Sequence, residues 1–249
     1  MRLRRSIRAG IRRFGYELTW VGGGQPEFPL DFDERSIATI RSVREFTMTP
    51  DERIFALCEA IRHVVRYSIP GDIVECGVWR GGSMMAAGRT LIESGDTTRR
   101  LHLFDTFEGM SDPTDADRRH DGVGATTILE EDPEYWCRAG LADVRGNIES
   151  TGYPTGLVNY VAGRVEETIP DQSPAMIALL RLDTDWYEST KHELEHLYPR
   201  VSPGGIVIID DYGFWHGARK ATDEFLDVLG EPLYLHRIDY SGRAFVKPG

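Results

Sequence analysis

The chain contains 249 residues, of which 29 are Lys or Arg and 40 are Asp or Glu, so its formal net charge is −11. This acidic balance argues against a nucleic-acid binder, and the length fits one large α/β domain with a small N-terminal appendage. The three cysteines include no CxxC pair, and no apolar run reaches about 18 residues. We therefore expect no zinc site of that kind, no transmembrane segment and a reducing, cytoplasmic setting.

Residues 1–20 have the pattern of a short basic amphipathic helix, with six arginines against the single acid Glu17. Two interpretations stay open. The helix docks on the body or on a second subunit, or it makes weak, transient contact with an anionic membrane surface. A Gly- and Pro-rich linker covers 21–29 and a polar lead-in segment follows. We thus expect an appendage over 1–48 and the main domain over 49–249.

The main domain is predicted to begin with a helix. Thr49-Pro50-Asp51-Glu52 matches a capping box with proline at the first helical position, and the helix that it opens should cover a sheet. The first strand is predicted over Asp72–Cys76. A glycine-rich corner over 77–83 and a helix to about Ser94 follow it, and the second strand covers 101–104 and ends at Asp105.

The middle of the chain is dominated by a polar segment over 111–127, which is too long for a simple connection. We interpret it as a mobile lid, with a solvated surface loop as the alternative. Asp132-Pro133 predicts the start of a helix that ends near Gly152, so we group 111–152 as lid loop and helix. The third strand is predicted over 157–162.

Two further strands, at 175–182 and 206–209, each end in an acidic corner: Asp183-Thr184-Asp185 and Asp210-Asp211. A helix is predicted between them over 188–198, with Pro203-Gly204-Gly205 as the turn that ends it. A helix over 218–229 follows. The last element is a hairpin that pairs 233–238 with Arg243–Val246.

This order of elements predicts an α/β fold, a doubly wound, seven-stranded, mostly parallel, Rossmann-like sheet with an antiparallel C-terminal hairpin. Residues 179–213 form a βαβ unit, so both acidic corners reach the same carboxyl edge, where such sheets bind ligands. Asp183, Asp185, Asp210 and Asp211 should therefore converge. Such a cluster repels itself unless protons or a cation neutralise it, and hard oxygen ligands favour Mg²⁺, Mn²⁺ or Ca²⁺ over zinc.

The corner after the first strand contains glycines at 77, 81 and 82, which do not form GxGxxG and so disfavour a nicotinamide oxidoreductase. Glu75 adds negative charge, which suits a sulfonium or ammonium ligand, and Asp105 can accept both hydroxyls of a ribose. The alternative for the glycine corner is a purely structural turn, and the alternative for Asp105 is an N-cap of the turn that follows. Together the corners indicate S-adenosylmethionine (SAM). The expected cofactor-binding residues are Glu75, Gly77, Val78, Ser83, Asp105, Thr106 and Asp183.

Four segments, 73–83, 103–110, 161–170 and 182–213, resemble in combination the macrocin O-methyltransferase family. These metal- and SAM-dependent enzymes methylate sugar hydroxyls on natural products such as macrolides and aminocoumarins. The resemblance covers about 47–217. It implies a class I SAM-dependent methyltransferase domain over 49–249 and a homodimer. It also implies Mg²⁺ at Asp183, Asp210 and Asp211, Asp185 as the general base, Glu75 and Gly77 beside the methionine part of SAM, and Asp105 on the ribose.

We therefore predict Mg²⁺-dependent transfer of a methyl group from SAM to a sugar hydroxyl of a glycosylated natural product or glycan. The metal lowers the pKa of the hydroxyl and Asp185 accepts its proton, unless Asp185 instead caps the helix that follows. Two other functions stay open: a catechol-type enzyme acting on a phenolic hydroxyl, and a noncatalytic SAM-binding partner of a biosynthetic complex. For His216 the pattern favours a capping or surface position over a second base.

Overall fold

The computed structural model describes residues 27–249, so the basic helix predicted at 1–20 lies outside the described residues. Residues 34–249 form one compact unit, which begins earlier than the boundary predicted at 48/49. That boundary stays a prediction. Within the described part of the chain, no helix is both long enough and apolar enough to cross a bilayer.

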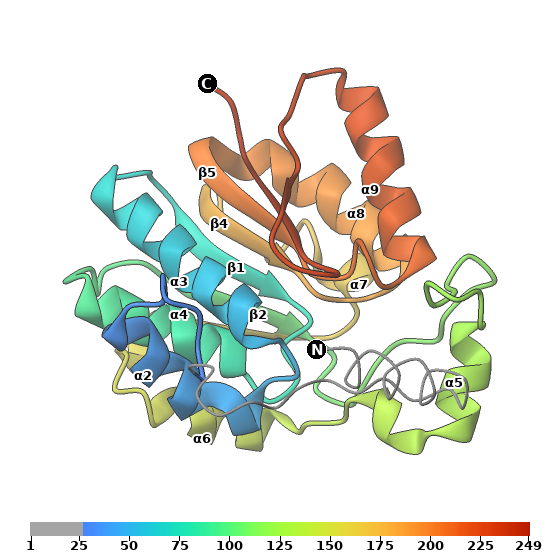
Figure 1. Ribbon diagram of the computed structural model, residues 1–249, viewed down its shortest axis with the longest axis horizontal. Helices are drawn as coiled ribbons and strands as arrows, with labels where there is room; N and C mark the ends of the chain where they lie inside the picture. Colours follow the sequence, from blue (N-terminus) through green and yellow to red (C-terminus); the bar gives the residue numbers. More distant parts are fainter. Residues whose placement is uncertain (1–26) are drawn as a thin grey trace, which may run out of the picture. The chain divides into compact units, whose positions relative to one another are not determined.

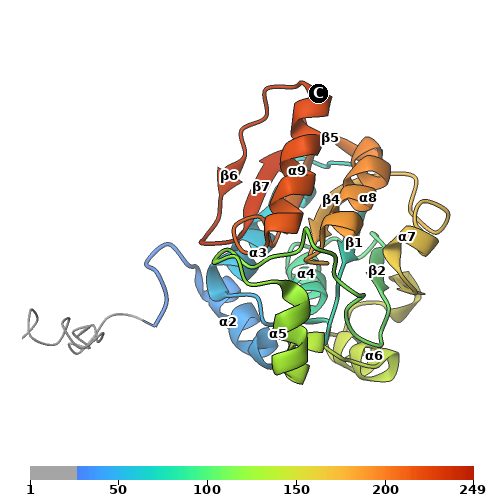
Figure 2. The ribbon, with the colours of Figure 1, turned by 90° about the vertical axis from the view of Figure 1, so that its right-hand side faces the viewer.

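Seven strands form one sheet in the order β3-β2-β1-β4-β5-β7-β6 (Figures 1 and 2). The first five run parallel to one another, and β7 pairs antiparallel with both β5 and β6. This confirms the predicted doubly wound sheet with its C-terminal hairpin. The strands are β1 (Asp72–Cys76), β2 (Leu101–Asp105), β3 (Val158–Ala162), β4 (Ile177–Leu182), β5 (Val201–Ile209), β6 (His236–Arg237) and β7 (Arg243–Val246).

Helices cover both faces of this sheet, with α2, α3 and α4 on one side and α8 and α9 on the other (Figure 1). The central strands are mostly apolar because both of their faces are buried, as β4 illustrates with apolar residues at every position except Arg181. The helices are α2 (Glu34–Val43), α3 (Asp51–Arg66), α4 (Gly82–Glu93), α5 (Ala125–Glu131), α6 (Leu141–Glu149), α7 (Val165–Thr168), α8 (Tyr187–Leu197) and α9 (His216–Leu229). Short 3₁₀ turns occupy Arg44–Phe46, Pro133–Trp136, Thr155–Leu157 and Tyr198–Arg200.

Two predicted elements differ from the structure. Pro203-Gly204-Gly205 does not end a helix but lies inside β5, where the pairing with β4 shifts register. Gly204 has φ +79° and donates its N–H to Lys247 O, so the bulge is stabilised by the chain end. The helix predicted from Asp132 to near Gly152 is split into a 3₁₀ turn and α6, and α5 occupies the end of the predicted polar loop.

The predicted capping box at Thr49 is also wrong. The N-cap of α3 is Pro50, and no side chain caps the helix. Thr49 Oγ1 instead accepts a hydrogen bond of 2.8 Å from Arg181 Nη2 on β4. Thr49 therefore does not cap α3, and its hydroxyl group forms a hydrogen bond with a residue on a distant strand instead.

Candidate active site

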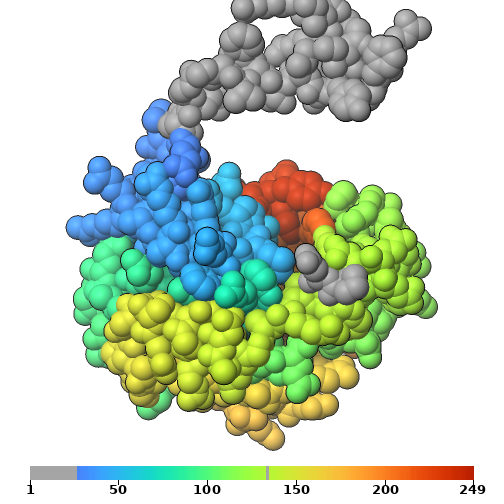
Figure 3. Space-filling model, turned by 90° about the horizontal axis from the view of Figure 1, so that it is seen from below, coloured from blue at the N-terminus to red at the C-terminus, as the bar shows by residue number. Residues whose placement is uncertain are grey.

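A pocket of about 640 Å³ lies at the carboxyl edge of the sheet and contains most of the predicted site. Three parts of the chain meet around it on one face: the segment before α3, the region around α5, and the C-terminal segment (Figure 3). The predicted site residues that line it are Gly77, Val78, Ser83, Asp105, Thr106, Asp183, Asp185, Asp210 and Asp211. The structure thus brings together the corners that the sequence places far apart, with Glu75 as the exception.

The glycine corner is forced by the close approach of two strand ends. Asp183 N–H donates to Cys76 O at 2.8 Å, and Gly77 has φ +81°. A Cβ atom on Gly77 would lie 2.0 Å from the carbonyl oxygen of Asp183. Glycine is required here both by the backbone conformation and by the lack of space.

We expect Gly77→Ala to destabilise the protein by about 1–3 kcal/mol or more, because the methyl group must push the ends of β1 and β4 apart. Gly95→Ala is the matched control, since Gly95 has a similar φ of +75° and an added Cβ meets nothing within 4 Å. Denaturant unfolding gives the loss of stability of each variant. The loss in Gly95→Ala measures the cost of a positive φ alone, and the additional loss in Gly77→Ala measures the steric clash. Equal losses would show that the strand ends do not restrict position 77.

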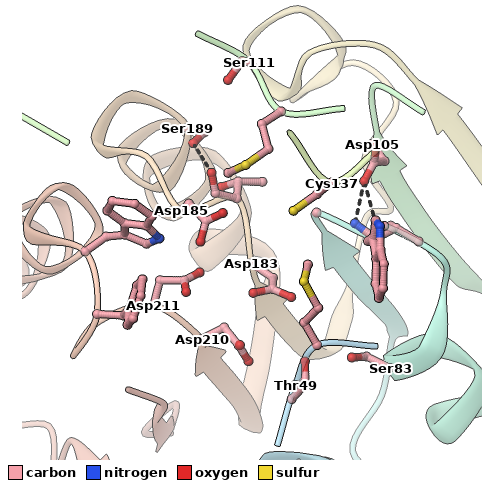
Figure 4. Close-up of a pocket in the computed structure, with 18 of the residues that line it drawn as sticks. Thr49, Ser83, Asp105, Ser111, Cys137, Asp183, Asp185, Ser189, Asp210 and Asp211 are labelled. Carbon is pink, nitrogen blue, oxygen red and sulfur yellow. Dashed lines mark hydrogen bonds between the residues drawn. The ribbon is translucent and has the colours of Figure 1, made fainter. Parts of the chain in front are cut away.

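Asp105 fastens the glycine corner to the end of β2. One carboxylate oxygen accepts the N–H groups of Val78 (2.6 Å) and Trp79 (3.1 Å), and the other accepts that of Phe107 (2.7 Å) (Figure 4). Burial raises the pKa of Asp105 against these backbone hydrogen bonds. The turn-capping role weighed for this residue is therefore present. Asp105 also lines the pocket, so binding of a ribose by its carboxylate is compatible with the structure and stays a proposal.

Glu75 is not among the residues that line the pocket, so its expected contact with a cationic ligand stays a prediction. Its side chain is 1% exposed and forms an ion pair with Arg181, the cross-strand neighbour on β4. Burial raises the pKa of Glu75 to about 7 despite this partner. The carboxyl group that we expected to face a cationic ligand therefore pairs with Arg181.

Two arginines that the sequence analysis did not single out pair with the acidic corners. Arg181 is 3% exposed, donates to Asp210 Oδ1 at 2.6 Å and forms an ion pair with Asp183 Oδ2 at 2.8 Å. Arg53 on α3 pairs with Asp210 and, at 2.8 Å, with Asp239. An arginine within the apolar run IALLRL was the available signal, because a charge in a strand buried on both faces requires partners.

The carboxylates of Asp183, Asp210 and Asp211 converge, and one ligand oxygen from each lies within 4.8 Å of the others (Figure 4). Burial and the neighbouring acids raise the pKa values of Asp183 and Asp211 well above the usual range, although Arg181 opposes the shift at Asp183. For Asp210, burial acts in the same direction, but Arg181 and Arg53 outweigh it and lower the pKa. The cluster is thus only partly neutralised.

The donor set fits a hard divalent cation, although the arginine partners count against it. Opposite oxygens around Mg²⁺ are about 4.2 Å apart, which falls within the 4.8 Å that bounds the separations of the three ligand oxygens. Oδ2 of Asp211 is buried without a hydrogen-bond partner, so it is available as a ligand. The two guanidinium groups form ion pairs with four carboxyl groups, those of Glu75, Asp183, Asp210 and Asp239. Neither forms an ion pair with Asp185 or Asp211, so acidic groups outnumber the arginines that pair with them.

Asp185 faces the pocket from a turn that follows β4. Its carboxyl group lies near that of Asp211, and burial together with the charge of Asp183 raises its pKa to about 7. It does not cap α8, so that alternative is wrong. The N-cap residue is Trp186, and the N–H of Tyr187 is satisfied instead by Asp117 Oδ1 at 2.8 Å. Asp117, from the predicted lid, is a structural residue that sequence reasoning missed.

The loop before α5 is tied to the site at several points. Asp117 is buried, Trp186 Nε1 donates to Ser111 O at 2.9 Å, and His120 N–H donates to Phe214 O at 2.8 Å. Met110 and Ser111 line the pocket. The loop therefore forms part of the wall, and its mobility as a lid stays a prediction. His216 is exposed and outside the pocket lining, in agreement with a surface position.

The remaining walls differ in character. Residues 163–166, after β3, line part of the pocket. The lining also includes aromatic side chains, and the faces of such side chains suit a sugar ring. Trp186, Tyr187 and Tyr212, which lie near the same edge of the sheet in sequence, are not in the lining, and Trp186 is buried against Trp215. The aromatic residues that do line the pocket are Phe104, Tyr135, Phe214, Trp215, Tyr240 and Trp79.

The chain is similar to known proteins in both sequence and fold. A family model described as Macrocin-O-methyltransferase (TylF) matches residues 24–247. The 8-demethyl-8-(2,3-dimethoxy-alpha-L-rhamnosyl)-tetracenomycin-C 4'-O-methyltransferase of Streptomyces olivaceus is 35% identical over 233 residues, which cover 90% of this chain and 82% of that protein. The mycinamicin III 3''-O-methyltransferase of Micromonospora griseorubida is 32% identical over 197 residues, covering 79% and 76%. The solved structure of the O-methyltransferase NovP has a TM-score of 0.73 at 29% identity, covering 82% of this chain and 83% of that chain.

Proposed function

The chain belongs to the macrocin-O-methyltransferase family of SAM-dependent O-methyltransferases, and we propose that it methylates a sugar hydroxyl of a glycosylated small molecule in a Mg²⁺-dependent reaction. The observation that carries the proposal is the convergence of Asp183, Asp210 and Asp211 in the pocket beside Asp185. One relative is named for O-methylation of a rhamnosyl-tetracenomycin and another for O-methylation of mycinamicin III, which supports a similar acceptor here.

We assign SAM to the side of the pocket formed by the corners after β1, β2 and β3. SAM supplies a methyl group that is already activated on a sulfonium centre, so the protein must align it with the acceptor oxygen. Asp105 is placed to accept the ribose hydroxyls. The negative charge near the sulfonium is assigned to Asp183, which lines the pocket, rather than to Glu75, which does not. The residues proposed to surround SAM are Gly77, Val78, Ser83, Asp105, Thr106 and Asp183.

We assign the acceptor hydroxyl to the acidic side of the pocket. A Mg²⁺ ion held by Asp183, Asp210 and Asp211 would lower the pKa of the bound hydroxyl. Asp185 then accepts the hydroxyl proton. Its environment suits this role, because a pKa of about 7 lies near a neutral working pH, where a general base is most effective. Arg181 and Arg53 both form ion pairs with Asp210, so the cluster keeps a defined geometry.

Chelation tests the metal role. Methyl transfer from labelled SAM to a panel of glycosides is expected to fall at least about 10-fold in EDTA and to return with Mg²⁺, because the acceptor hydroxyl loses its activation. Asp211→Asn is expected to resemble the chelated wild type.

Full activity in EDTA would remove the metal from the proposal. Transfer to catechols but to no glycoside would support the phenol-directed alternative. SAM binding without transfer to any acceptor would support a noncatalytic partner.

We further propose a cytoplasmic homodimer, as the family resemblance and the reduced cysteines suggest. The cysteines at 58 and 76 are buried thiols, as expected for core residues. Sedimentation velocity on the full-length protein measures the oligomeric state directly, and a monomer at micromolar concentration would contradict the dimer.

A further inference from the structure

The candidate base lies in an unusual backbone turn. The N–H of Trp186 donates to Thr184 O at 2.7 Å, two residues back, and Asp185 between them has φ +66°. A turn with this hydrogen bond and a positive φ at its central residue is rare and strained, typically by about 1–3 kcal/mol for a residue other than glycine. Such a turn persists only where surrounding contacts hold it.

One contact comes from Glu193 on α8. Its carboxyl group is 0% exposed and accepts the hydroxyl of Thr184, with distances of 3.0 Å and 3.1 Å to its two oxygens. It also lies near the thiol of Cys76, the last residue of β1, and helps to raise the pKa of that thiol. This single buried side chain on α8 therefore holds the chain segment that leaves β4 and lies beside the end of β1.

Packing alone does not account for a glutamate at this position. The neighbouring buried residues of α8, Leu194 and Leu197, are apolar and belong to the core. Burial raises the pKa of Glu193 well above its usual range, and the charged groups that act on it, Glu166, Asp183 and Asp211, are themselves acids. An apolar side chain would avoid the cost of burying a carboxyl group in such surroundings. The hydrogen bond to Thr184 is the contact that an apolar residue could not make.

We propose that Glu193 is a positioning residue, which holds Thr184 and thereby keeps the Asp185 carboxyl group directed into the pocket. Thr184 lies between Asp183 and Asp185 in the chain. Its hydroxyl group donates to Glu193 and not to either acid, so this contact holds the backbone of the turn. Ser189 Oγ donates to Trp186 O at 3.2 Å and braces the other end of the turn. This inference rests on the proposed function, because it requires Asp185 to be the base.

Removal of the contact should affect turnover rather than binding. Glu193→Leu and Thr184→Val are each expected to lower kcat about 10- to 100-fold, since a displacement of about 1 Å at a reacting group can cost 10²-fold. The KM for SAM and the calorimetric affinity for S-adenosylhomocysteine should stay within about twofold of wild type. Glu193→Gln and Thr184→Ser keep the contact and should restore most of kcat. The double variant Thr184→Val/Glu193→Leu should be no slower than either single variant, because both remove the same contact.

Glu195→Leu is the matched control, because Glu195 lies on the same helix and is exposed. Wild-type kcat in folded Thr184→Val and Glu193→Leu would overturn the inference. So would a parallel loss of kcat, cofactor affinity and thermal midpoint, which would show general structural damage. If Glu193→Leu does not fold, the inference is tested by comparing Thr184→Val with Thr184→Ser, and Glu193→Gln with wild type. Full activity of Asp185→Asn would instead refute the proposed base, whatever the Glu193 variants do.

Discussion

Asp185→Asn is expected to lower kcat by about 10²–10⁴-fold, the range typical for loss of a general base. Asparagine has nearly the same shape but cannot accept the hydroxyl proton. Affinity for SAM should change little, since the proposed cofactor residues other than Asp183 lie at other corners of the pocket and the substitution leaves Asp183 in place. The variant should be at least as stable as wild type, because burial and the charge of Asp183 already disfavour the ionised form of Asp185.

Single-turnover kinetics with labelled SAM and a glycoside acceptor measure this effect, and thermal unfolding provides the stability comparison. Asp112→Asn is the matched control, because Asp112 is an exposed acid of the nearby loop that does not line the pocket. It should retain wild-type turnover. An Asp185→Asn enzyme that turns over like the control would show that another group, or bulk water, accepts the proton.

Arg181→Met is expected to destabilise the protein by about 3–5 kcal/mol, as is usual when one member of a buried ionic network is removed. Methionine fills much of the same space, so the loss should arise from charge rather than from a cavity. Glu75, Asp183 and Asp210 each lose a cation at 3% exposure, and Thr49 loses its hydrogen-bond donor. Denaturant unfolding in EDTA measures the difference without interference from divalent ions.

The effect of Arg181→Met should grow with pH. Glu75 has a folded pKa of about 7 against 4.5 for an unperturbed glutamate, so its contribution is fully present below about pH 4.5 and is lost as pH rises through 7. Without Arg181 the folded pKa rises further, and the loss of stability extends to higher pH. The variant should therefore differ from wild type more at pH 8 than at pH 5.

Two further variants test the cause of this effect. Arg219→Met removes an exposed arginine paired with Asp223 on the same helix, and should cost about 0–1 kcal/mol. The double variant Glu75→Gln/Arg181→Met should recover part of the lost stability, because it also removes one of the stranded charges. A loss independent of pH, or no recovery in the double variant, would indicate that Arg181 acts through packing.

Local sequence information was sufficient for the main elements of the fold and for the location of the site. The strand at Asp72–Cys76 was predicted with its observed bounds, and the two acidic corners after β4 and β5 meet as expected. Both follow from patterns within a few residues: an apolar run that ends in acids or glycines, repeated with helical segments between. The carboxyl ends of parallel strands share one edge, so the corners had to converge once the topology was known.

The partners of those acids were decided only by the tertiary structure. Arg181 meets Glu75 because β1 and β4 are neighbours in a particular register, and Arg53 reaches Asp210 because α3 packs beside the same edge. Asp117 caps α8 from a loop that is distant in sequence, and Thr49 leaves its expected capping role for Arg181. Such contacts depend on which buried polar groups come together on folding, and each group takes the partner that lowers its desolvation cost most. The sequence therefore determined where the chemistry gathers, whereas the packing of distant segments determined which of its charges are neutralised and which remain available to a ligand.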